Sequence, residues 1–575
     1  MQLSKNVFRV LFAGGVSVLV SCNQGSKGAG ADGFSTDTTI IAAGEASFGK
    51  NCKSCHGFLQ DGIGPQLGGI TEKFSAEWLI RFIKNPAEVI ASGDKDAQQL
   101  HEKYKAIMPS FQAMDEAELN AIVSFLHTKK NTAVAADNDS TAIANPFPKP
   151  IPFSDITINL KPLMQIPASA KTAPLARITK LVAQPGTGDL CILDLRGKLY
   201  KVINNQPVVY MDISKLRPRF IEQPGLGSGF GSFAFHPDFQ KNGLLYTSHT
   251  EAAGSANADF KYNDSIKVAL QWVLTEWKTS DPKAPVFSGT GREILRVNFV
   301  SVIHGMQEIV FNPYAKPGDK DYGMLYACIG DGGSVEQGYP LIPHNTSHIW
   351  GTVIRIDPRG NNSKNKQYGI PGDNPFVNST DDSRLKEIYC YGFRNPHRIS
   401  WTKAREMLVF NIGQHEIESI YMVKPGQDCG WPIREGIFSI NPYGNINAVH
   451  PLPADDSVYH ITYPIASFDH DEGNAISGGY EYTGSSIAML KGKIVFGDIP
   501  SGRVFYIESN DNKPGKMAAI KELHIAINGK PETLDKACGN KRVEIRFGED
   551  TAGELYVLTK ADGKVYKVAS ATATQ

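Results

Sequence analysis

The sequence has no excess of charge of either sign, and its N-terminal apolar run is too short to cross a membrane. Lys and Arg together number 59, which equals the 59 Asp and Glu residues. A balanced charge excludes a chain-wide field that would attract nucleic acid or an anionic lipid surface. The apolar run at 10–20 is interrupted by Gly14, Gly15 and Ser17, so we expect a targeting segment there and no membrane span.

Cysteine is scarce, with eight residues in a chain of 575, so each one has to be accounted for. Cys52, Cys55 and His56 form a C-x-x-C-H motif. Two thiols at this spacing can each form a thioether to a haem vinyl group, and the following histidine can take an axial iron site. The alternative is a dithiol redox pair, which usually lies in a βαβ context and does not need the histidine. The motif therefore predicts haem c.

A third cysteine follows the N-terminal apolar run. Lys5 and Arg9 precede the run, which ends in Leu19-Val20-Ser21-Cys22 and resembles a bacterial lipobox. The resemblance implies that residues 1–22 are a signal peptide and that Cys22 becomes the acylated first residue of a lipoprotein. Its lipid would anchor it in the bacterial cell envelope, on the periplasmic side or at the outer membrane. An ordinary signal peptide cut nearby is the alternative, and either interpretation predicts export.

The five remaining cysteines are spread over the rest of the chain. Because five is odd, at most two disulfides can form among them and one thiol is left over. The sequence does not decide the pairing of Cys191, Cys328, Cys390, Cys429 and Cys538.

Residues 40–130 have the pattern of a small helical domain, preceded by a Gly-, Ser- and Thr-rich tether at 23–39. Ser75 is placed to cap one helix, and Asp115 with Glu118 forms the capping-box pattern of another. A domain of about ninety residues with so few hydrophobic side chains needs a further group around which to pack. A haem would supply that core.

The second iron ligand has to come from outside the haem motif. Met108 lies in the Pro-containing loop 107–111, while Gly64-Pro65 follows the motif and would support His56 from below. Together these features resemble a class I cytochrome c over the whole domain, which implies that Met108 is the distal ligand; Met114 and His101 are rivals. Methionine ligation raises the reduction potential, which suits an acceptor of electrons.

The rest of the chain repeats short hairpins after a linker at 131–153. Pairs of apolar strands joined by a glycine turn occur at 190–202, 494–507 and 555–568. No convincing long helix separates them, and about seventy residues per unit would make six units. The fold class expected is therefore a small all-α domain followed by an all-β six-bladed propeller at 154–575.

Several stretches resemble the soluble quinoprotein glucose and aldose sugar dehydrogenases. Each is weak alone, but as a set they cover most of 170–568; they lie at 229–239, 329–333, 391–396, 413–414 with 430–432, and 475–479 with 497–498. The resemblance implies a propeller that binds pyrroloquinoline quinone (PQQ) through calcium. The last stretches also look like the extracellular Hedgehog-interacting relatives, which share the propeller without established redox chemistry.

The resemblance assigns roles to individual residues. His304 falls where the family has its catalytic base, and an imidazole is suited to take a hydroxyl proton. Arg394 and Asn395 match the polar pair beside the quinone. The carbonyls of Gly413 and Gln414 match the calcium ligands, which are hard oxygens. Arg542 matches an arginine that holds a quinone carboxylate.

The sequence also departs from the family at four polar positions. The acidic residue before the catalytic histidine is Ile303, and a Gln or Glu is replaced by Gly227. The carboxylate-binding lysine falls near Pro500, and a second arginine falls near Asn540. PQQ carries three carboxylates, so losing two cations removes much of its charge pairing. Three cations close in sequence are possible substitutes: Arg398, Lys541 and Arg503.

The fusion itself suggests the function. A quinol releases two electrons and a haem accepts one at a time, so a tethered cytochrome would drain the propeller by proximity. We expect a dehydrogenase that uses PQQ and calcium to oxidise an aldose or related alcohol and passes electrons to haem c and then to a downstream acceptor. The alternatives are a cytochrome joined to a propeller that only binds carbohydrate or protein, and a cell-surface protein whose haem is only a relay.

Overall fold

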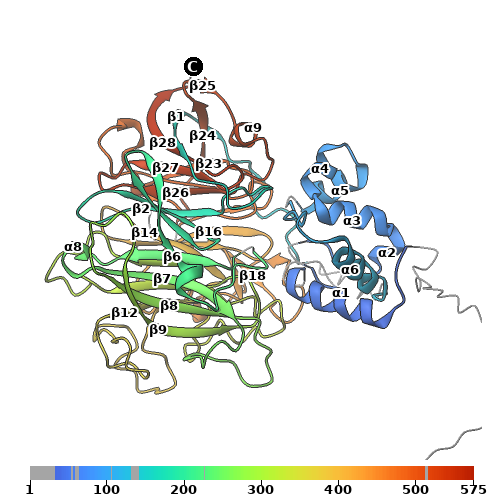
Figure 1. Ribbon diagram of the computed structural model, residues 1–575, viewed down its shortest axis with the longest axis horizontal. Helices are drawn as coiled ribbons and strands as arrows, with labels where there is room; N and C mark the ends of the chain where they lie inside the picture. The colour runs from blue at the N-terminus through green and yellow to red at the C-terminus, as the bar shows by residue number, and fades with distance from the viewer. Residues whose placement is uncertain are drawn as a thin grey trace, which may run out of the picture.

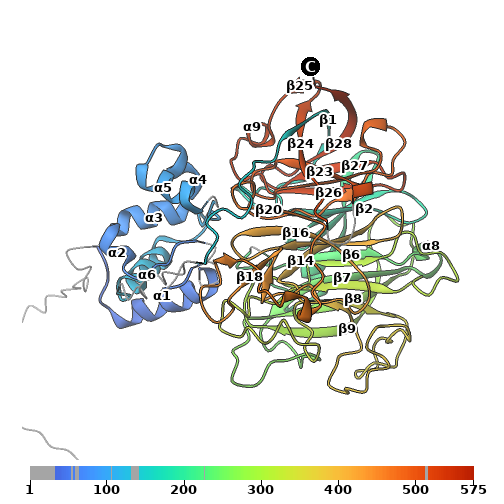
Figure 2. The same ribbon diagram turned by 180° about the vertical axis from the view of Figure 1, so that it is seen from behind.

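The computed structural model describes residues 33–52, 56–58, 64–104, 107–130, 141–225, 227–511 and 516–574. A helical domain, blue in Figure 1, lies against one side of a much larger β domain. The view from behind shows the same arrangement, with strand β18 on the side of the β domain that faces the helices (Figure 2). The prediction of an all-α part followed by an all-β part is confirmed. Among the described residues, no helix combines the length and apolar character needed to cross a membrane.

The helical domain begins earlier than the sequence indicates. Asp37 caps the first helix, and Phe34 is buried and stacks on His127 with ring centroids 4.3 Å apart. Residues 34–39 are therefore part of the domain, although their composition resembles a tether. Its helices are α1 (Thr38–Asn51), α2 (Ile70–Lys73), α3 (Ala76–Lys84), α4 (Pro86–Ala91), α5 (Lys95–Tyr104) and α6 (Glu116–His127).

The predicted caps are confirmed at two helices. Ser75 Oγ accepts from the N–H of Trp78 at 3.2 Å, and Asp115 Oδ1 accepts from the N–H of Glu118 at 2.7 Å. Helices α1 and α6 pack closely at Gly44, where an added Cβ would lie 1.9 Å from the carbonyl oxygen of Ala121. This close crossing leaves the other side of α6 free to face the pocket described below.

The β domain is built from antiparallel units of four strands, and the hairpins predicted at 190–202, 494–507 and 555–568 lie within these units. Longer loops connect several of the other strands. The first two units are β2 (Ile178–Ala183), β3 (Leu190–Asp194), β4 (Lys198–Ile203) and β5 (Gln206–Asp212), then β6 (Phe230–Phe235), β7 (Leu244–Ala252), β8 (Leu270–Thr279) and β9 (Gly289–Phe299). The next two are β10 (Glu308–Phe311), β11 (Leu325–Ile329), β12 (Thr352–Ile356) and β13 (Ile388–Tyr391), then β14 (Asn395–Trp401), β15 (Met407–Ile412), β16 (Ile417–Val423) and β20 (Ala466–Asp469).

The remaining strands bring the two ends of the domain together. They are β21 (Tyr480–Glu481), β22 (Lys493–Gly497), β23 (Val504–Glu508) and β24 (Lys521–Ile527), then β26 (Ile545–Glu549), β27 (Leu555–Thr559), β28 (Lys564–Ala573) and β1 (Phe153–Gln165). Strand β1 pairs antiparallel with β28 and parallel with β24, while β2 pairs parallel with β26. The N-terminal strand thus completes the C-terminal unit and fixes the ends of the domain to each other.

Shorter elements lie between these strands. A three-stranded sheet of β17 (Arg434–Glu435), β18 (Phe438–Ile440) and β19 (Val449–His450) is inserted after β16, and β25 (Lys530–Pro531) pairs with β24. Single-turn helices are α7 (Ile213–Leu216), α8 (Phe239–Asn242) and α9 (Leu534–Cys538), with 3₁₀ turns at Asp456–Tyr459, Ala488–Leu490 and Ser509–Asp511.

Apolar side chains fill the spaces between neighbouring units. The strands read as nearly continuous buried runs because both faces of each unit are covered by other units. Cys191, Cys328, Cys390 and Cys429 are buried as free thiols, and Cys538 is free and partly exposed. The sequence allowed up to two disulfides among these five cysteines, and the structure has none.

The segment that begins at residue 141 follows the surface of the β domain. The N–H of Ile143 donates to the carbonyl of Val449 at 2.9 Å, and the N–H of Phe147 donates to Asp469 Oδ2 at 2.9 Å. This part of the predicted linker is therefore held on the propeller side, which limits how far the helical domain can move away.

One glycine positions the loop that carries His304. A Cβ at Gly305 would lie 2.0 Å from Nε1 of Trp272, whose ring is almost completely buried. We predict that Gly305→Ala lowers the free energy of unfolding by about 2 kcal/mol, because overpacking forces a rigid ring to move. Urea denaturation of the full chain measures this. Gly372→Ala is the control, since a Cβ at 372 meets nothing within 4 Å; equal effects of the two changes would contradict the packing account.

Candidate functional site

The haem motif lies beside a preformed histidine support. His56 Nδ1 is 2.8 Å from the carbonyl oxygen of Pro65, and a Cβ at Gly64 would lie 2.4 Å from His56 Cε1. A hydrogen bond from Nδ1–H to a carbonyl fixes the ring and leaves Nε2 for a metal. The structure thus confirms that 64–65 supports His56. Cys52 is described, whereas Cys55 and Cys22 lie outside the described residues, so their roles stay predictions.

A largely apolar cavity of about 270 Å³ lies in front of His56. Met108 lines it, and Cys52, Trp78, Phe82 and Leu126 also contribute to its walls. The methionine loop is fixed to α3, because Ser110 Oγ donates to the carbonyl of Lys84 at 2.7 Å and the N–H of Phe111 donates to that of Ile83 at 3.2 Å.

The two rivals for the second iron site are placed differently. Met114 is not among the residues that line the cavity, whereas His101 does line it and keeps a buried Nδ1 without a partner among the described residues. The assignment of Met108 stays a prediction, with His101 as its rival. A supported imidazole, a thioether on the cavity wall and apolar walls together fit a haem, which when bound supplies a one-electron carrier.

The β domain supplies part of the haem cavity. Ile303 and Arg542 line it beside the residues of the helical domain. Arg542 donates to the carbonyl of Ile107 at 2.7 Å, one residue before Met108, and pairs with Glu544 at 2.7 Å. The side of the haem cavity that the helices leave open is therefore covered by the β domain.

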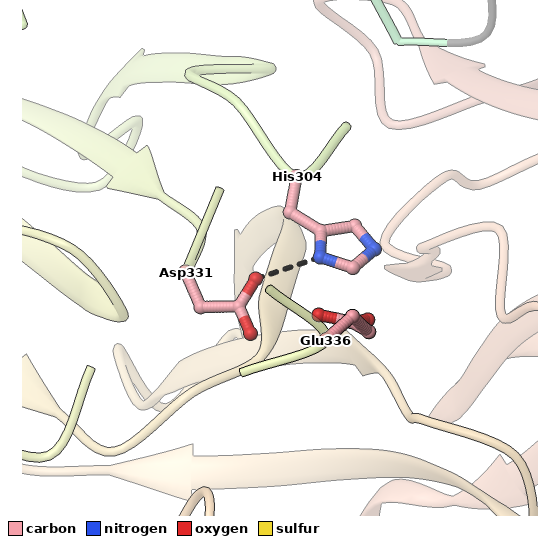
Figure 3. A group of neighbouring side chains, drawn as sticks. All are labelled: His304, Asp331 and Glu336. Carbon is pink, nitrogen blue, oxygen red and sulfur yellow. Dashed lines mark hydrogen bonds and ion pairs between the residues drawn. The ribbon is translucent and has the colours of Figure 1, made fainter. Parts of the chain in front are cut away.

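Directly next to Ile303, the chain turns into a buried polar site. His304 Nδ1 is 2.7 Å from Asp331 Oδ1 (Figure 3). His304 has a φ of 51°, a conformation that costs energy for a residue with a Cβ and is common at functional sites. Asp331 also accepts from the N–H of Gly333 at 2.8 Å and from Trp431 Nε1 at 2.9 Å. These bonds hold the carboxylate so that it orients the imidazole.

Burial and a nearby guanidinium set the charges of this pair. Burial, with the Arg394 guanidinium beside it, lowers the pKa of His304 to about 3, so the imidazole is neutral at neutral pH. Burial raises the pKa of Asp331 to about 6, while Arg394 and the hydrogen bonds from Gly333 and Trp431 act in the opposite direction. A neutral histidine held by an ionised aspartate is suited to accept a proton.

Arg394 connects this pair to the residues expected at calcium. Its guanidinium donates to Glu336 Oε1 at 2.8 Å, to Gln414 Oε1 at 2.7 Å and to the carbonyl of Gly413 at 2.5 Å. The structure therefore brings His304, Arg394, Gly413 and Gln414 together. The Gly413 carbonyl is engaged by a cation that belongs to the protein, so its role as a calcium ligand stays a prediction.

Two buried oxygen atoms at this site have no hydrogen-bond partner among the described residues: Glu336 Oε2 and Asn395 Oδ1. His304, Asp331 and Glu336 offer ligand atoms within 4.8 Å of one another, the spacing of a metal site. Hydrogen bonds already occupy both oxygens of Asp331, so the group fits a metal ion poorly. It fits better a base, His304, that Asp331 orients, beside a carboxylate, Glu336, that can accept a hydrogen bond from a polar substrate or cofactor.

The family's missing side chains are replaced in different ways. At Gly227 a Cβ would lie 2.6 Å from Gln307 Nε2, which instead donates to the Gly227 carbonyl at 2.9 Å. Ile303, at the position where the resemblance expects an acidic residue, lines the haem cavity. Pro500 and Asn540 line separate cavities, of about 870 and 780 Å³, between the two domains.

The three substitute cations proposed from sequence are engaged elsewhere. Arg398 donates to the carbonyls of Gln307 and Thr179, Arg503 pairs with Glu522 and Glu472, and Lys541 pairs with Asp535 on the surface. Arg542 is directed to Ile107. The residues thus fit the proton-accepting end of a quinone site and do not supply the expected cations for its carboxylates.

Three residues of this site have no role assigned from the sequence. Asp331 precedes two glycines, as in a turn, Trp431 precedes a proline, and Glu336 lies outside every motif. The turn pattern does not reveal that Asp331 faces His304, 27 positions away. The Asp331-Gly332-Gly333 run after a buried strand was the available signal.

The comparisons with known proteins agree with this geometry. The sequence pattern of the "Glucose / Sorbosone dehydrogenase" family matches residues 165–567, and that of "Cytochrome c" matches residues 41–130. The chain belongs to the glucose/sorbosone dehydrogenase family and carries a cytochrome c domain in front of it. The two matches relate the chain to the sugar dehydrogenases and to the cytochromes c.

Individual relatives are distant. HIPL1 protein of Arabidopsis thaliana is 25% identical over 390 residues, covering 59% of this chain and 53% of that protein. Quinoprotein glucose dehydrogenase B of Acinetobacter calcoaceticus is 24% identical over 244 residues, covering 40% of this chain and 45% of that protein. The chain thus spans about half the length of the curated relatives that it matches.

Solved structures share the fold of the β domain. The soluble aldose sugar dehydrogenase of Escherichia coli, in its apo form, has a TM-score of 0.50 at 17% identity and covers 72% of this chain and 100% of that one. At this identity the likeness shows the fold alone.

The contact between Arg542 and the methionine loop predicts an effect on the haem. We expect Arg542→Gln to lower the reduction potential, because a positive charge near the iron favours the reduced form. At a fixed ambient potential the ratio of reduced to oxidised haem should fall severalfold, where a tenfold change corresponds to about 59 mV for one electron. Spectroelectrochemical titration measures it. Lys541→Gln removes an exposed neighbouring charge, and an equal shift in that variant would contradict a specific role for Arg542.

Proposed function

We propose that the protein is a dehydrogenase that oxidises a hydroxyl group of an aldose or related alcohol in its β domain and passes the electrons to its own haem. One observation carries the proposal. Ile303 lines the haem cavity, and the next residue, His304, belongs to the buried base pair. Under this proposal, adjacent residues of the β domain would belong to the two redox sites.

His304 would accept the substrate's hydroxyl proton. Its Nδ1 faces Asp331, so the other ring nitrogen is the one available to a substrate, and Asp331 would stabilise the imidazolium that forms. The Arg394 guanidinium, held by Glu336 and Gln414, would orient polar groups of the bound molecules. The buried surroundings of His304 keep water away and strengthen these interactions.

PQQ is the cofactor that we propose, with calcium, because the family membership and the His304 geometry favour it. When bound, it would supply the acceptor for the two electrons of the alcohol. Arg394 and Asn395 would lie beside it, and the carbonyls of Gly413 and Gln414 would be the calcium ligands if Arg394 releases the Gly413 carbonyl. The four-stranded units support the further proposal of a six-bladed propeller closed by the β1–β28 pairing.

Export, lipid attachment at Cys22 and location in the cell envelope belong to the same proposal, since they rest on the sequence pattern at 1–22. A cell-envelope enzyme of this kind would hand electrons from its haem to a further acceptor. A second candidate is a cytochrome joined to a propeller that only binds carbohydrate or protein, favoured by the loss of cations at Pro500 and Asn540.

The experiment that separates these candidates uses haem-loaded, oxidised protein without oxygen. Calcium, PQQ and a panel of aldoses are added while the absorption band of reduced haem is recorded. We predict reduction that requires PQQ and a sugar and that slows by about 100-fold or more in His304→Ala, the usual loss for a general base.

The matched control is His344→Ala, which removes another histidine–aspartate pair, at 2.8 Å from Asp428, near the outer strand β13. Its rate of haem reduction should equal that of the unchanged protein. Failure of PQQ to bind, tested by calorimetry, would contradict the dehydrogenase proposal and leave the binding propeller.

The pKa of Asp331 predicts how the rate depends on pH. Because burial raises this pKa to about 6, the carboxylate is present above pH 6 and becomes protonated as the pH falls through that value. The rate of sugar-dependent haem reduction should therefore fall about tenfold per pH unit below 6. Asp331→Asn should lose this limb and be slow at every pH. A profile of Asp331→Asn that still falls below pH 6 would show that another group is responsible.

A further inference from the structure

Behind the candidate site, the first strands of several units bring buried cations together. Arg177, Lys180, Arg398, Arg546 and Lys560 are each at least nine-tenths buried. Charged side chains of this kind are rarely buried unless they are paired. Three carboxylates face these five cations: Glu222, Glu308 and Glu544.

The pairings leave one of the five, Arg546, with little compensation. Glu308 pairs with Lys180 and, at 3.4 Å, with Arg398. Glu544 is shared between Lys560, at 2.8 Å, and Arg542, at 2.7 Å. Among the described residues, the side chain of Arg546 has one hydrogen bond, from its guanidinium to the carbonyl of the preceding residue, Ile545, at 2.7 Å. The described carboxylates therefore do not balance the cations around Arg546.

Backbone pairing shows that these groups lie together. Strand β2 pairs with β26 at Leu181 and Gly548, which places Thr179 beside Arg546 two residues earlier. Arg398 donates to the Thr179 carbonyl at 2.9 Å. Lys560 follows β27, and its N–H donates to the carbonyl of Glu544 at 3.4 Å. Glu544 directly precedes strand β26, which carries Arg546, and its carboxylate is close enough to raise the pKa of the Arg546 guanidinium against the effect of burial.

Buried polar atoms in this group also lack partners among the described residues. They are Arg546 Nε, His397 Nε2 and Thr179 Oγ1, on side chains that are 5%, 4% and 3% exposed. His397 uses its other ring nitrogen toward Gln307 Oε1 at 3.1 Å. A buried Arg N–H without an acceptor is costly, so an acceptor that carries negative charge is expected there.

The electrostatics agree with the geometry. Burial, and then the repulsion from Arg546, lower the pKa of Lys560 to about 7. Burial and the neighbours Arg398, Arg542 and Arg177 lower the pKa of Arg546 to about 9, although Glu544 opposes this. The cations thus repel one another in a medium that does not screen them, and an anion would relieve that repulsion.

We propose that Arg546, Lys560 and His397 form an anion site that takes an oxyanion or a single carboxylate group. The site is reached from the cavity of about 780 Å³ between the domains, because Arg177 and Glu544 line that cavity. An oxygen anion matches the donors, since a guanidinium N–H and an ammonium group both favour carboxylate or phosphate. The cations of this site are at other positions in the sequence than Pro500 and Asn540, where the family resemblance leads us to expect cations.

Two sources supply this chemistry: a free oxyanion such as phosphate, or a carboxylate of a larger molecule such as PQQ. The second source rests on the proposed function, and the first does not. The test follows thermal unfolding of the haem-loaded full chain while inorganic phosphate is added at constant ionic strength. The unfolding midpoint should rise with the logarithm of phosphate concentration, because a ligand that binds only the folded state stabilises it.

Lys560→Met is the decisive variant, with Lys541→Met as its exposed control. Lys560→Met should weaken phosphate binding at least tenfold, and without phosphate its midpoint should equal or exceed that of the unchanged protein because a repelled charge is removed. If Lys560 is only a structural partner of Glu544, the variant would instead melt lower and respond to phosphate normally, which would overturn the proposal. Lys541→Met should respond like the unchanged protein.

PQQ without calcium, added in competition with phosphate, identifies the source. Displacement of phosphate by PQQ would assign the site to a cofactor carboxylate. Phosphate binding without displacement would assign it to a free anion, and the site would stand even though the PQQ proposal had failed. No midpoint rise with either compound in the unchanged protein would show that the site does not exist.

Discussion

The structure depends on a haem cavity that the cytochrome domain does not close by itself. The helices supply His56, its support and the methionine loop, but Ile303 and Arg542 of the β domain complete the wall. Because a haem is mostly apolar and its potential responds to burial and nearby charge, the domain that closes the cavity also sets part of the redox behaviour. The contact between the two domains therefore affects the reduction potential of the haem directly.

Charge placement distinguishes this chain from the family pattern that its sequence resembles. The His304–Asp331 pair and Arg394 lie together, whereas Pro500 and Asn540 stand where the resemblance expects cations. Arg542 contacts the helical domain, while Arg546 on β26 and Lys560 directly after β27 are buried inside the β domain. Ile303 suits a position that lines the haem cavity, because an acidic side chain buried there without a partner would cost free energy.

The sequence predicts most of the local structure and the identity of the two domains. Caps at Ser75 and Asp115 and the strand pairs around glycine turns are local signals, and the structure has them all. It does not predict contacts between distant segments. The composition around Phe34 suggests a tether, but its ring stacks on His127. The glycines after Asp331 suggest a turn, but its carboxylate contacts His304. The role of Arg542 depends on how two domains meet, which no local pattern encodes.

The most direct test of this account is an experimental structure of the haem-loaded protein. The account predicts that Ile303 lies in van der Waals contact with the porphyrin and that Arg542 still donates to the Ile107 carbonyl. The His304 imidazole would then be the nearest proton acceptor to the haem on the β-domain side. A haem whose edge is separated from Ile303 by solvent, or a helical domain that occupies another face of the β domain, would contradict it.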